Sequence, residues 1–349
     1  MNKRTLLFIP IAWITFVLIT TGTEIYELGD GRFGTREEVV SEKAESGGLI
    51  TITAASYLSG KLYINVGDNN EARFSYKKII KTSSHSKAID YADLIQVELQ
   101  KSIDGLNLLL RSPNPAPWSS SDEAGIIEGN LDIPAGSRIE VDADYFDLIV
   151  DGPFSSVKNE GSFGQIDAQN IQDRIELTTT SRDISLKDIK GEVVINTTNA
   201  DIRIKNMVTS FEPARIKNEN GNILIDGATG SFVVRSSFGK IRLSGIQLVG
   251  ENTRIIGNHC PIRMEIEKLS DAYLAITNNY EDVELAVPKD LSANFSLEVN
   301  PDGEIHVVDI PVKPLQVTRN RMEMVSGDGE GQITIDLGGN ADISIEGVR

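Results

Sequence analysis

Four aspartates lie close together in the sequence: Asp142, Asp144, Asp147 and Asp151. Carboxylate oxygens are the ligands that calcium prefers, and Asp142 and Asp144 would share one face if residues 141–145 formed a strand. β-Helical polysaccharide lyases combine such carboxylates with a basic partner. The outer face of a repetitive β structure is also solvated and acidic. The sequence therefore predicts no catalytic residue, cofactor or metal, and these aspartates are the candidate ligands if a metal binds.

Other reactive residue types are sparse. His259 adjoins Cys260, the only cysteine. Neighbours on a strand point to opposite faces, so the two cannot readily form a nucleophilic pair or share a metal. We expect a buried thiol beside an exposed imidazole. No sequence typical of a nucleophile elbow, a zinc site or a phosphate loop is present. Four Ser-x-x-Lys sequences occur, but none begins a helical pattern.

The start of the chain, 1–22, has the layout of a signal peptide: Lys3 and Arg4 precede an uncharged, largely apolar run, 5–21. If this segment is not cleaved, it could anchor the chain in a membrane. Both outcomes place the chain after Glu24 outside the cytoplasm, in the periplasm, at the cell surface or in the medium. The segment 23–48 is expected to be a linker.

The charge balance limits the partners. The whole chain has a net charge of −17, and without Lys3 and Arg4 it holds 32 basic and 51 acidic residues, a net charge of −19. Such a surface repels nucleic acid and anionic lipid. A single cysteine allows no disulfide within the chain, so stability must come from burial and backbone pairing.

An internal repeat occupies the C-terminal two thirds. Short phrases with apolar residues two places apart recur roughly every 20 residues, and spacing by two puts both side chains on one face of a strand. A second apolar triplet lies between most successive phrases. The first apolar residues of the phrases are Ile166, Ile184, Ile202, Ile223, Ile241, Ile262, Val283 and Ile305.

A repeat of about 20 residues cannot bury its own apolar face, but stacked repeats can. The pattern predicts an all-β protein, a parallel β-solenoid (a single-stranded β-helix) over 131–349, preceded by an N-terminal β region over 49–130. Ile184 should lie between Ile166 and Ile202. An antiparallel meander folded into a sandwich is the alternative, because short strands at regular spacing also fit it.

The sequence resembles the bacterial putative-adhesin family over about 45–349. The matching phrases are Gly60-Lys61-Leu62-Tyr63-Ile64, the run Leu131 to Gly136, and Gly-x-Ile phrases such as Gly164 to Ile166. The resemblance implies an exported solenoid domain, related to the head domains of autotransporter adhesins, with right-handed winding. It supplies no catalytic residue. The family often has Gly two places before the Ile, where this chain has Arg182, Ala200 and Glu281.

We hypothesise an exported, non-enzymatic module of the cell envelope that binds an unknown surface ligand or an envelope protein. A carbohydrate-active β-helical enzyme is the main alternative, and a groove with three or more carboxylates and a Lys or Arg would favour it. A regulatory or assembly partner is the third hypothesis, and it predicts an exposed apolar patch or an open sheet edge.

Overall fold

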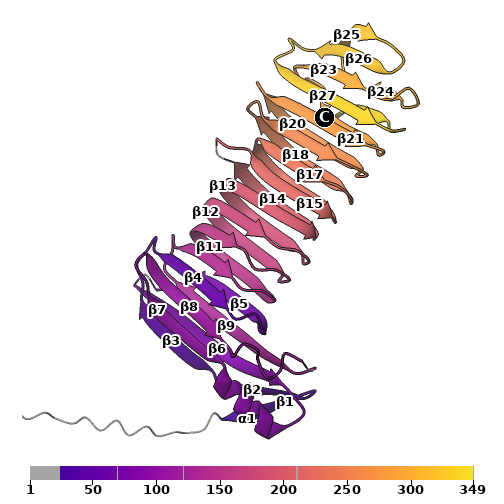
Figure 1. Cartoon of the computed structure of the whole chain (residues 1–349). Helices are drawn as coiled ribbons and strands as arrows, with labels where there is room; N and C mark the ends of the chain where they lie inside the picture. The colour runs from indigo at the N-terminus through magenta and orange to yellow at the C-terminus, as the bar shows by residue number, and fades with distance from the viewer. Residues whose placement is uncertain (1–23, 69, 121, 210, 349) are drawn as a thin grey trace, which may run out of the picture.

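The computed structural model describes residues 24–68, 70–120, 122–209 and 211–348. In this part the protein is mostly β, with 28 strands in one largely parallel sheet and one helix. Figure 1 shows an elongated column, with the N-terminal strands at one end and the C-terminal strands at the other. No helix of the described part is long and apolar enough to cross a membrane. The predicted signal or anchor segment, 1–22, lies outside the described residues.

Each winding of the column contributes strands that pair in parallel with those of the next winding (Figure 1). Ser185 pairs with Arg203 and Arg203 with Leu224, so the pairing offset equals the repeat interval of the sequence. The strands are β10 (Arg138–Asp142), β11 (Phe146–Asn159), β12 (Ile166–Thr178), β13 (Ile184–Asn199), β14 (Ile202–Thr209), β15 (Ala214–Asn220), β16 (Ile223–Gly230), β17 (Phe232–Ser236), β18 (Ile241–Val249), β19 (Thr253–Gly257), β20 (Ile262–Ser270), β21 (Tyr273–Asn279) and β22 (Val283–Pro288).

The core is a stack of aliphatic side chains inside the column. Ile184 pairs with Ile202, Ile202 with Ile223, and Ile223 with Ile241. All four are at most 1% exposed. Burial of each such side chain contributes about 1.5–3 kcal/mol. The predicted stacking of these residues is confirmed, and because their strands pair in parallel, the antiparallel meander is wrong for this region.

The C-terminal end departs from the predicted order. Val283 pairs with Ile343, and Ile343 in turn pairs with Ile305, so the expected direct neighbourhood of Val283 and Ile305 is wrong. The chain passes beyond the winding, turns back and inserts its last strands. In the described part β24 pairs only with β28 and β25 only with β26, which leaves two free strand edges. The strands are β23 (Ala293–Glu298), β24 (Ile305–Val308), β25 (Val312–Val317), β26 (Arg321–Ser326), β27 (Gly331–Gly338) and β28 (Ile343–Val348).

The N-terminal end mixes parallel and antiparallel pairing. β4 lies between β8 and β10, and β5 lies between β9 and β11, all in parallel. β6 pairs antiparallel with β2, β3 and β9. The elements are β1 (Ile25–Gly29), β2 (Arg32–Thr35), β3 (Glu38–Lys43), β4 (Leu49–Ala54), β5 (Leu58–Val66), β6 (Glu71–Lys81), α1 (His85–Leu94), β7 (Gln96–Lys101), β8 (Gly105–Arg111) and β9 (Ala124–Ile133).

One N-terminal segment differs from the expected organisation. The segment 23–48, expected as a linker, contains β1, β2 and β3. β1 pairs with β2, whereas β2 and β3 pair with β6, which is distant in the sequence. No repeated phrase in the sequence therefore predicts these three strands. The Pro- and Ser-rich loop after β8 is fixed by Trp118, which is 4% exposed and donates from Nε1 to the Tyr57 carbonyl at 2.7 Å.

A carboxylate ties the helix to the sheet at this end. Glu123 accepts hydrogen bonds from Thr82 Oγ1 at 2.5 Å and Tyr91 Oη at 2.9 Å, and its Oε1 lies 3.2 Å from Lys87 Nζ. These donors, Thr82 first, lower the pKa of Glu123 to about 2 from its ordinary value of 4.5, because they stabilise the charged form. Helix α1 is thereby fixed to β6 and to the loop before β9.

Candidate functional site

The aspartate cluster is used to hold windings together. β10 ends at Asp142, so the strand through residue 145 that would place Asp142 and Asp144 on one face does not form. Asp144 Oδ1 accepts from the Ser162 N–H at 2.8 Å, and Asp147 Oδ1 accepts from the Gln165 N–H at 3.0 Å. Both donors belong to the next winding. These two carboxylates therefore satisfy backbone groups one winding away.

Asp151 also contacts the next winding, because its Oδ1 accepts from Asn170 Nδ2 at 3.3 Å. Among the described residues, no group of three or more His, Cys, Asp or Glu side chains could hold a metal ion. Asp144, Asp147 and Asp151 each accept a hydrogen bond from the next winding.

A different acidic group surrounds a hollow of about 500 Å³ at the ends of β5, β6 and β9. Asp68, Glu71 and Asp132 line it together with Arg73. Asp132 pairs across the sheet with Arg73 and accepts from Asn130 Nδ2 at 2.9 Å. Three carboxylates with one arginine are the combination that would favour an enzyme. Sequence reasoning missed this group because Asp132 is far from the others in the chain.

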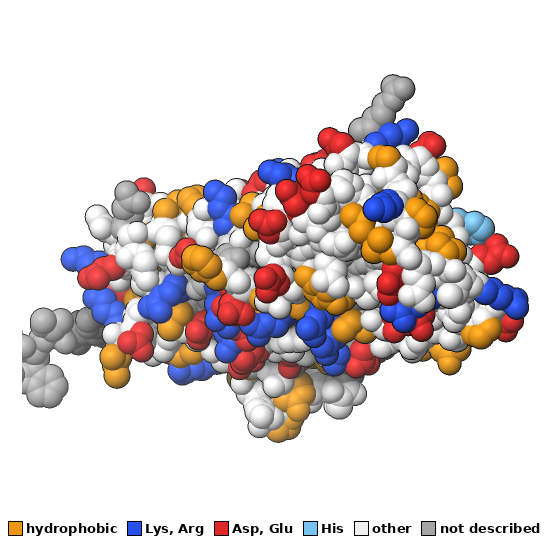
Figure 2. Space-filling model, turned by 90° about the horizontal axis from the view of Figure 1, so that it is seen from above, with side chains coloured by type: hydrophobic (Ala, Val, Ile, Leu, Met, Phe, Trp, Pro, Cys, Tyr) orange, Lys and Arg blue, Asp and Glu red, His pale blue; other side chains and the backbone are white. Residues whose placement is uncertain are grey.

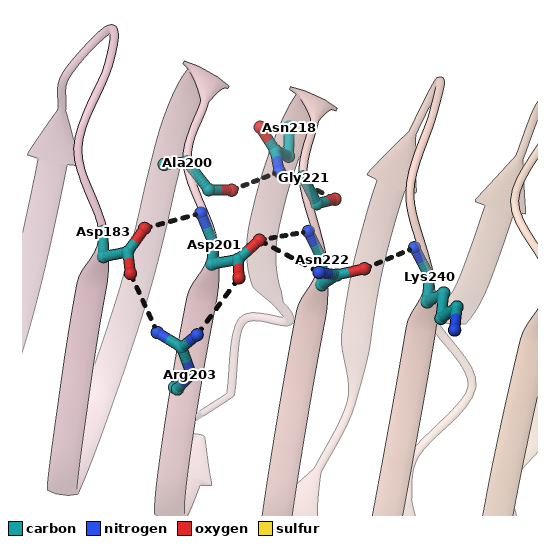
Figure 3. Close-up of polar contacts among 8 residues, drawn as sticks. All are labelled: Asp183, Ala200, Asp201, Arg203, Asn218, Gly221, Asn222 and Lys240. Carbon is teal, nitrogen blue, oxygen red and sulfur yellow. Dashed lines mark hydrogen bonds and ion pairs between the residues drawn. The ribbon is translucent and has the colours of Figure 1, made fainter.

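A polar ladder runs along one corner of the column and is defined by Asp183, Asp201, Asn222 and Lys240 (Figure 3). Asp183 Oδ1 accepts from the Asp201 N–H at 3.3 Å, and Asp201 Oδ1 accepts from the Asn222 N–H at 2.8 Å. Asn222 Oδ1 then accepts from the Lys240 N–H at 3.1 Å. Each of these residues directly precedes the first apolar residue of its repeat, so the ladder explains why an acid or amide recurs there.

Arg203 adds charge to this ladder. Its guanidinium lies 3.1 Å from Asp183 Oδ2 and 3.1 Å from Asp201 Oδ2 (Figure 3). The Arg203 side chain is 49% exposed, so each ion pair contributes no more than about 1 kcal/mol. The carboxylates of the ladder are engaged by the protein itself and are poor candidates for a ligand.

Buried asparagines close two turns in the same row as the polar ladder. Asn218 Nδ2 donates to the Ala200 carbonyl at 2.8 Å and to the Gly221 carbonyl at 3.2 Å (Figure 3). Asn278 does the same with the carbonyls of Cys260 and Glu281. Gly221 has a φ of +112°, and a Cβ on it would lie 2.3 Å from the Ala200 oxygen. Windings approach so closely at this turn that only glycine fits.

The turns beyond these asparagines carry exposed aromatic rings, which we call the aromatic corner: Phe238, His259 and Tyr280. The rings of Phe238 and His259 are 5.6 Å apart with planes at 4°, and those of His259 and Tyr280 are 4.5 Å apart at 8°. Phe238 is 50% exposed and Tyr280 59%. His259 and Tyr280 have positive φ angles, 57° and 73°, which bulky residues rarely adopt. A similar pair, Tyr145 and Phe163, stacks at 4.9 Å nearer the N-terminal end.

The expectation for the histidine and cysteine is confirmed. Cys260 is fully buried and its Sγ lies 3.4 Å from the Ser236 carbonyl, whereas His259 is exposed in the aromatic corner. The three rings of that corner recur at the repeat interval of the sequence. Aligning turn residues as well as isoleucines would have revealed the aromatic corner.

The surface over the windings is mixed in charge. Figure 2 shows acidic and basic side chains interspersed over the face in view, with hydrophobic side chains between them. Opposite charges at such spacing partly offset one another's electrostatic potential.

The geometry defines a class of repeat proteins in which short parallel strands stack along one axis. Residues 131–346 match the Toastrack DUF4097 domain, and the chain belongs to this family. The predicted resemblance to the putative-adhesin family is thereby confirmed. No curated protein matches the chain.

Several solved structures are similar to the chain. A putative cell adhesion protein from Clostridium sporogenes is 10% identical, with 90% of this chain and 100% of that chain covered and a TM-score of 0.21. A putative adhesin from Parabacteroides merdae is 7% identical (90% and 96% covered, TM-score 0.27). A putative lipid binding protein from Parabacteroides distasonis is 13% identical (90% and 97% covered, TM-score 0.24). None of these three is named as an enzyme.

Proposed function

We propose that this chain is an exported, non-enzymatic binding or structural element of the bacterial envelope. Its column is assigned as a right-handed parallel β-solenoid with windings of about 20 residues each. The observation that carries this proposal is the division of labour within one row of turns. The polar ladder satisfies the backbone and locks the windings in register, while the aromatic corner, in the same row of turns, leaves large side chains exposed on a rigid support.

The proposed location outside the cytoplasm rests on the segment 1–22 and on composition. A positive start followed by an uncharged apolar run directs export. The acidic remainder, with a single buried cysteine, needs no disulfide and stays soluble outside the cytoplasm.

The test of export is a periplasmic reporter, alkaline phosphatase, fused after Arg349. We expect activity from the full chain and none from a matched fusion that lacks the segment 1–22. Equal activity of the two fusions, or none from either, would contradict export. Fractionation of the same cells then shows whether the chain stays with the membrane, as an anchor would require, or is released.

The binding role is tested with envelope fractions immobilised on a surface. We expect the full chain to be retained and a Phe238→Ser/Tyr280→Ser variant to be retained several-fold less. The matched control is Leu315→Ser/Val317→Ser, which removes exposed apolar side chains from β25. Equal retention of both variants and the unchanged chain would reject the aromatic corner as a binding element.

A second candidate function, a carbohydrate-active enzyme, is favoured by the hollow that contains Asp68, Glu71, Asp132 and Arg73. In lyase chemistry a base removes the C5 proton, α to a uronate carboxylate, and a cation stabilises the resulting negative charge. The C4–O bond then breaks, a C4–C5 double bond forms, and the departing glycosidic oxygen takes up a proton. Appearance of unsaturated product from polygalacturonate, lost in Arg73→Gln and in Asp132→Asn but kept in Asp336→Asn, would establish it. No product from the unchanged chain on polygalacturonate would count against this candidate.

A further inference from the structure

We propose that the outward face of β15, β17 and β19 binds an anionic polysaccharide through four cations, which we call the basic face: Arg215, Lys217, Arg235 and Arg254. This proposal deepens the proposed binding function by naming the ligand class. All four side chains are exposed. They come from three successive windings, so they occupy neighbouring strands about 4.8 Å apart.

The register places the cations in two rows along the column. Lys217 pairs directly with Arg235 on the next strand. Arg215 and Arg254 both pair with Val233, which lies between them. Like charges opposite one another on neighbouring strands are destabilising. The cluster therefore lowers the stability of the free column.

Few carboxylates of the chain offset this repulsion. Of the four cations, only Arg215 has a carboxylate within 4.0 Å among the described residues, Glu212 at 3.6 Å. Glu219, two residues after Lys217, is the other acid at the margin. Three other arginines of the column have carboxylates nearby: Arg174 has Glu176 and Glu192, Arg203 has Asp183 and Asp201, and Arg263 has Glu284. Arg242 has none within 4.0 Å among the described residues, but its neighbour across the sheet, Arg263, does. The basic face is thus a local excess of positive charge on an acidic protein.

The other outward positions of these two rows carry neutral side chains. In the two rows, the outward residues from β13 to β21 other than the cations are Val194, Asn196, Val233, Ile256, Ala275 and Thr277. The nearest carboxylates in these rows lie outside this stretch, at Glu176 on β12 and at Asp336 on β27. Four of these six residues are aliphatic, and the amide of Asn196, which pairs with Lys217, and the hydroxyl of Thr277 can bond to the hydroxyls of a ligand whose carboxylates meet the cations.

The aromatic corner borders the basic face, because Phe238 follows Arg235 by three residues and His259 follows Arg254 by five. Its stacked rings present their edges to solvent at the end of the same strands. An extended sugar chain lying across the face could contact cations, neutral polar groups and ring edges together. Arginine and aromatic side chains are the groups that contribute most per residue at binding surfaces.

The strand pairing argues against an acidic peptide. Peptides commonly add a strand to a free sheet edge, but β15, β17 and β19 each have parallel partners on both sides. Nucleic acid and anionic membranes are larger than the basic face, and the net charge of −17 would repel them outside it. A narrow anionic chain meets the cations without approaching the acidic remainder.

The test uses the full chain and fluorescent polygalacturonate, with binding measured by anisotropy. We expect binding that weakens as salt is raised, and at least about tenfold weaker binding for Lys217→Gln/Arg235→Gln/Arg254→Gln. The control, Lys205→Gln/Arg242→Gln/Arg263→Gln, makes the same charge change on β14, β18 and β20 and should stay within about twofold of the unchanged chain. Circular dichroism melting of all three proteins checks that each is folded.

Three results would overturn the proposal: no binding of polygalacturonate by the folded unchanged chain, equal binding by the basic-face variant, or equal loss in the control variant. Polyglutamate tests for a peptide ligand. Tighter binding of polyglutamate than of polygalacturonate would overturn the polysaccharide proposal in favour of an acidic peptide. Neutral dextran should not bind. The export reporter is independent of these outcomes, so failure of the polysaccharide proposal and failure of the envelope proposal can be told apart.

Discussion

Two sets of residues in the same row of turns use repetition in opposite ways. On the polar ladder, the side-chain oxygens of Asp201 and Asn222 accept backbone hydrogen bonds from the following winding. On the aromatic corner, His259 and Tyr280 stack on each other but leave much of their surface exposed, in backbone conformations that disfavour bulky residues. Both sets recur at the repeat interval, so periodicity alone cannot tell side chains that bond to the next winding from side chains left exposed. The contacts that the side-chain atoms make distinguish the two sets.

The largest effect is expected where the windings approach most closely. Gly221→Ala would place a methyl group 2.3 Å from the Ala200 carbonyl oxygen, a backbone atom that cannot move without disturbing the Asn218 bonds. We expect a loss of about 3 kcal/mol in the free energy of unfolding, measured with urea. The control is Gly250→Ala, also at positive φ but with open space around it, which should cost only about 1 kcal/mol. Equal losses of stability in the two variants would show that neighbouring windings are not in close contact at Gly221.

A smaller loss is expected from the polar ladder itself. Asp201→Ala removes the acceptor for the Asn222 N–H and Nδ2 and one partner of Arg203. We expect a loss of about 1–2 kcal/mol in the free energy of unfolding, because part of the lost bonding is replaced by water. Asp336→Ala on the exposed outer side of β27 should change it by less than about 0.5 kcal/mol. If the two substitutions prove equivalent, the ladder does not hold the windings.

At the N-terminal end, as on the polar ladder, a carboxylate holds separate segments of the chain together, and here its contribution to stability depends on pH. Glu123 has a lowered pKa, about 2 in the folded chain against 4.5 ordinarily. Its contribution to stability is therefore complete above pH 4.5 and is lost as the pH falls towards 2. Glu123→Gln should flatten this part of the curve of melting temperature against pH, and Glu128→Gln should leave the curve unchanged. An unaltered curve in Glu123→Gln would show that the Glu123 carboxylate does not contribute to the stability of this end.

The smallest stability effect is expected at the aromatic corner. His259→Gly removes ring stacking worth about 1 kcal/mol but also relieves a positive φ that costs about 1–2 kcal/mol, so the free energy of unfolding should stay within about 1 kcal/mol. Ile262→Ala, three residues on and 1% exposed, should lose about 2–4 kcal/mol. A large loss in His259→Gly would make the aromatic corner a structural element and weaken its assignment as a binding surface.

The repeated part of the fold was predictable because each isoleucine of the stack must face its equivalent one winding away. The pairs of Ile184, Ile202 and Ile223 follow directly from spacing. The order at the C-terminal end was not predictable, since Ile305 and Ile343 carry the same local pattern and only packing decides which lies beside Val283. β1 to β3 were not predicted because β2 and β3 pair with β6, which is remote in the sequence, and β1 pairs only with β2 in the described part.

The candidate sites were less predictable than the fold. The aspartate cluster was visible because its members are close in sequence, yet Asp144 and Asp147 are engaged by the next winding. The hollow with Asp68 and Asp132, and the basic face with Arg215 and Arg254, draw residues from different strands. Short sequence motifs report neighbours along a chain, whereas a wound chain creates most of its neighbours across windings.

The inserted C-terminal strands affect when the column can be completed. β27 lies between β21 and β23, and β28 lies between β22 and β24, although both are made after them. During synthesis the earlier windings can close one after another, but β21 and β22 must wait with open edges until residues 331–348 are made. Without β27 and β28, the four strands β21, β22, β23 and β24 would each lack a partner and could pair with a neighbouring molecule.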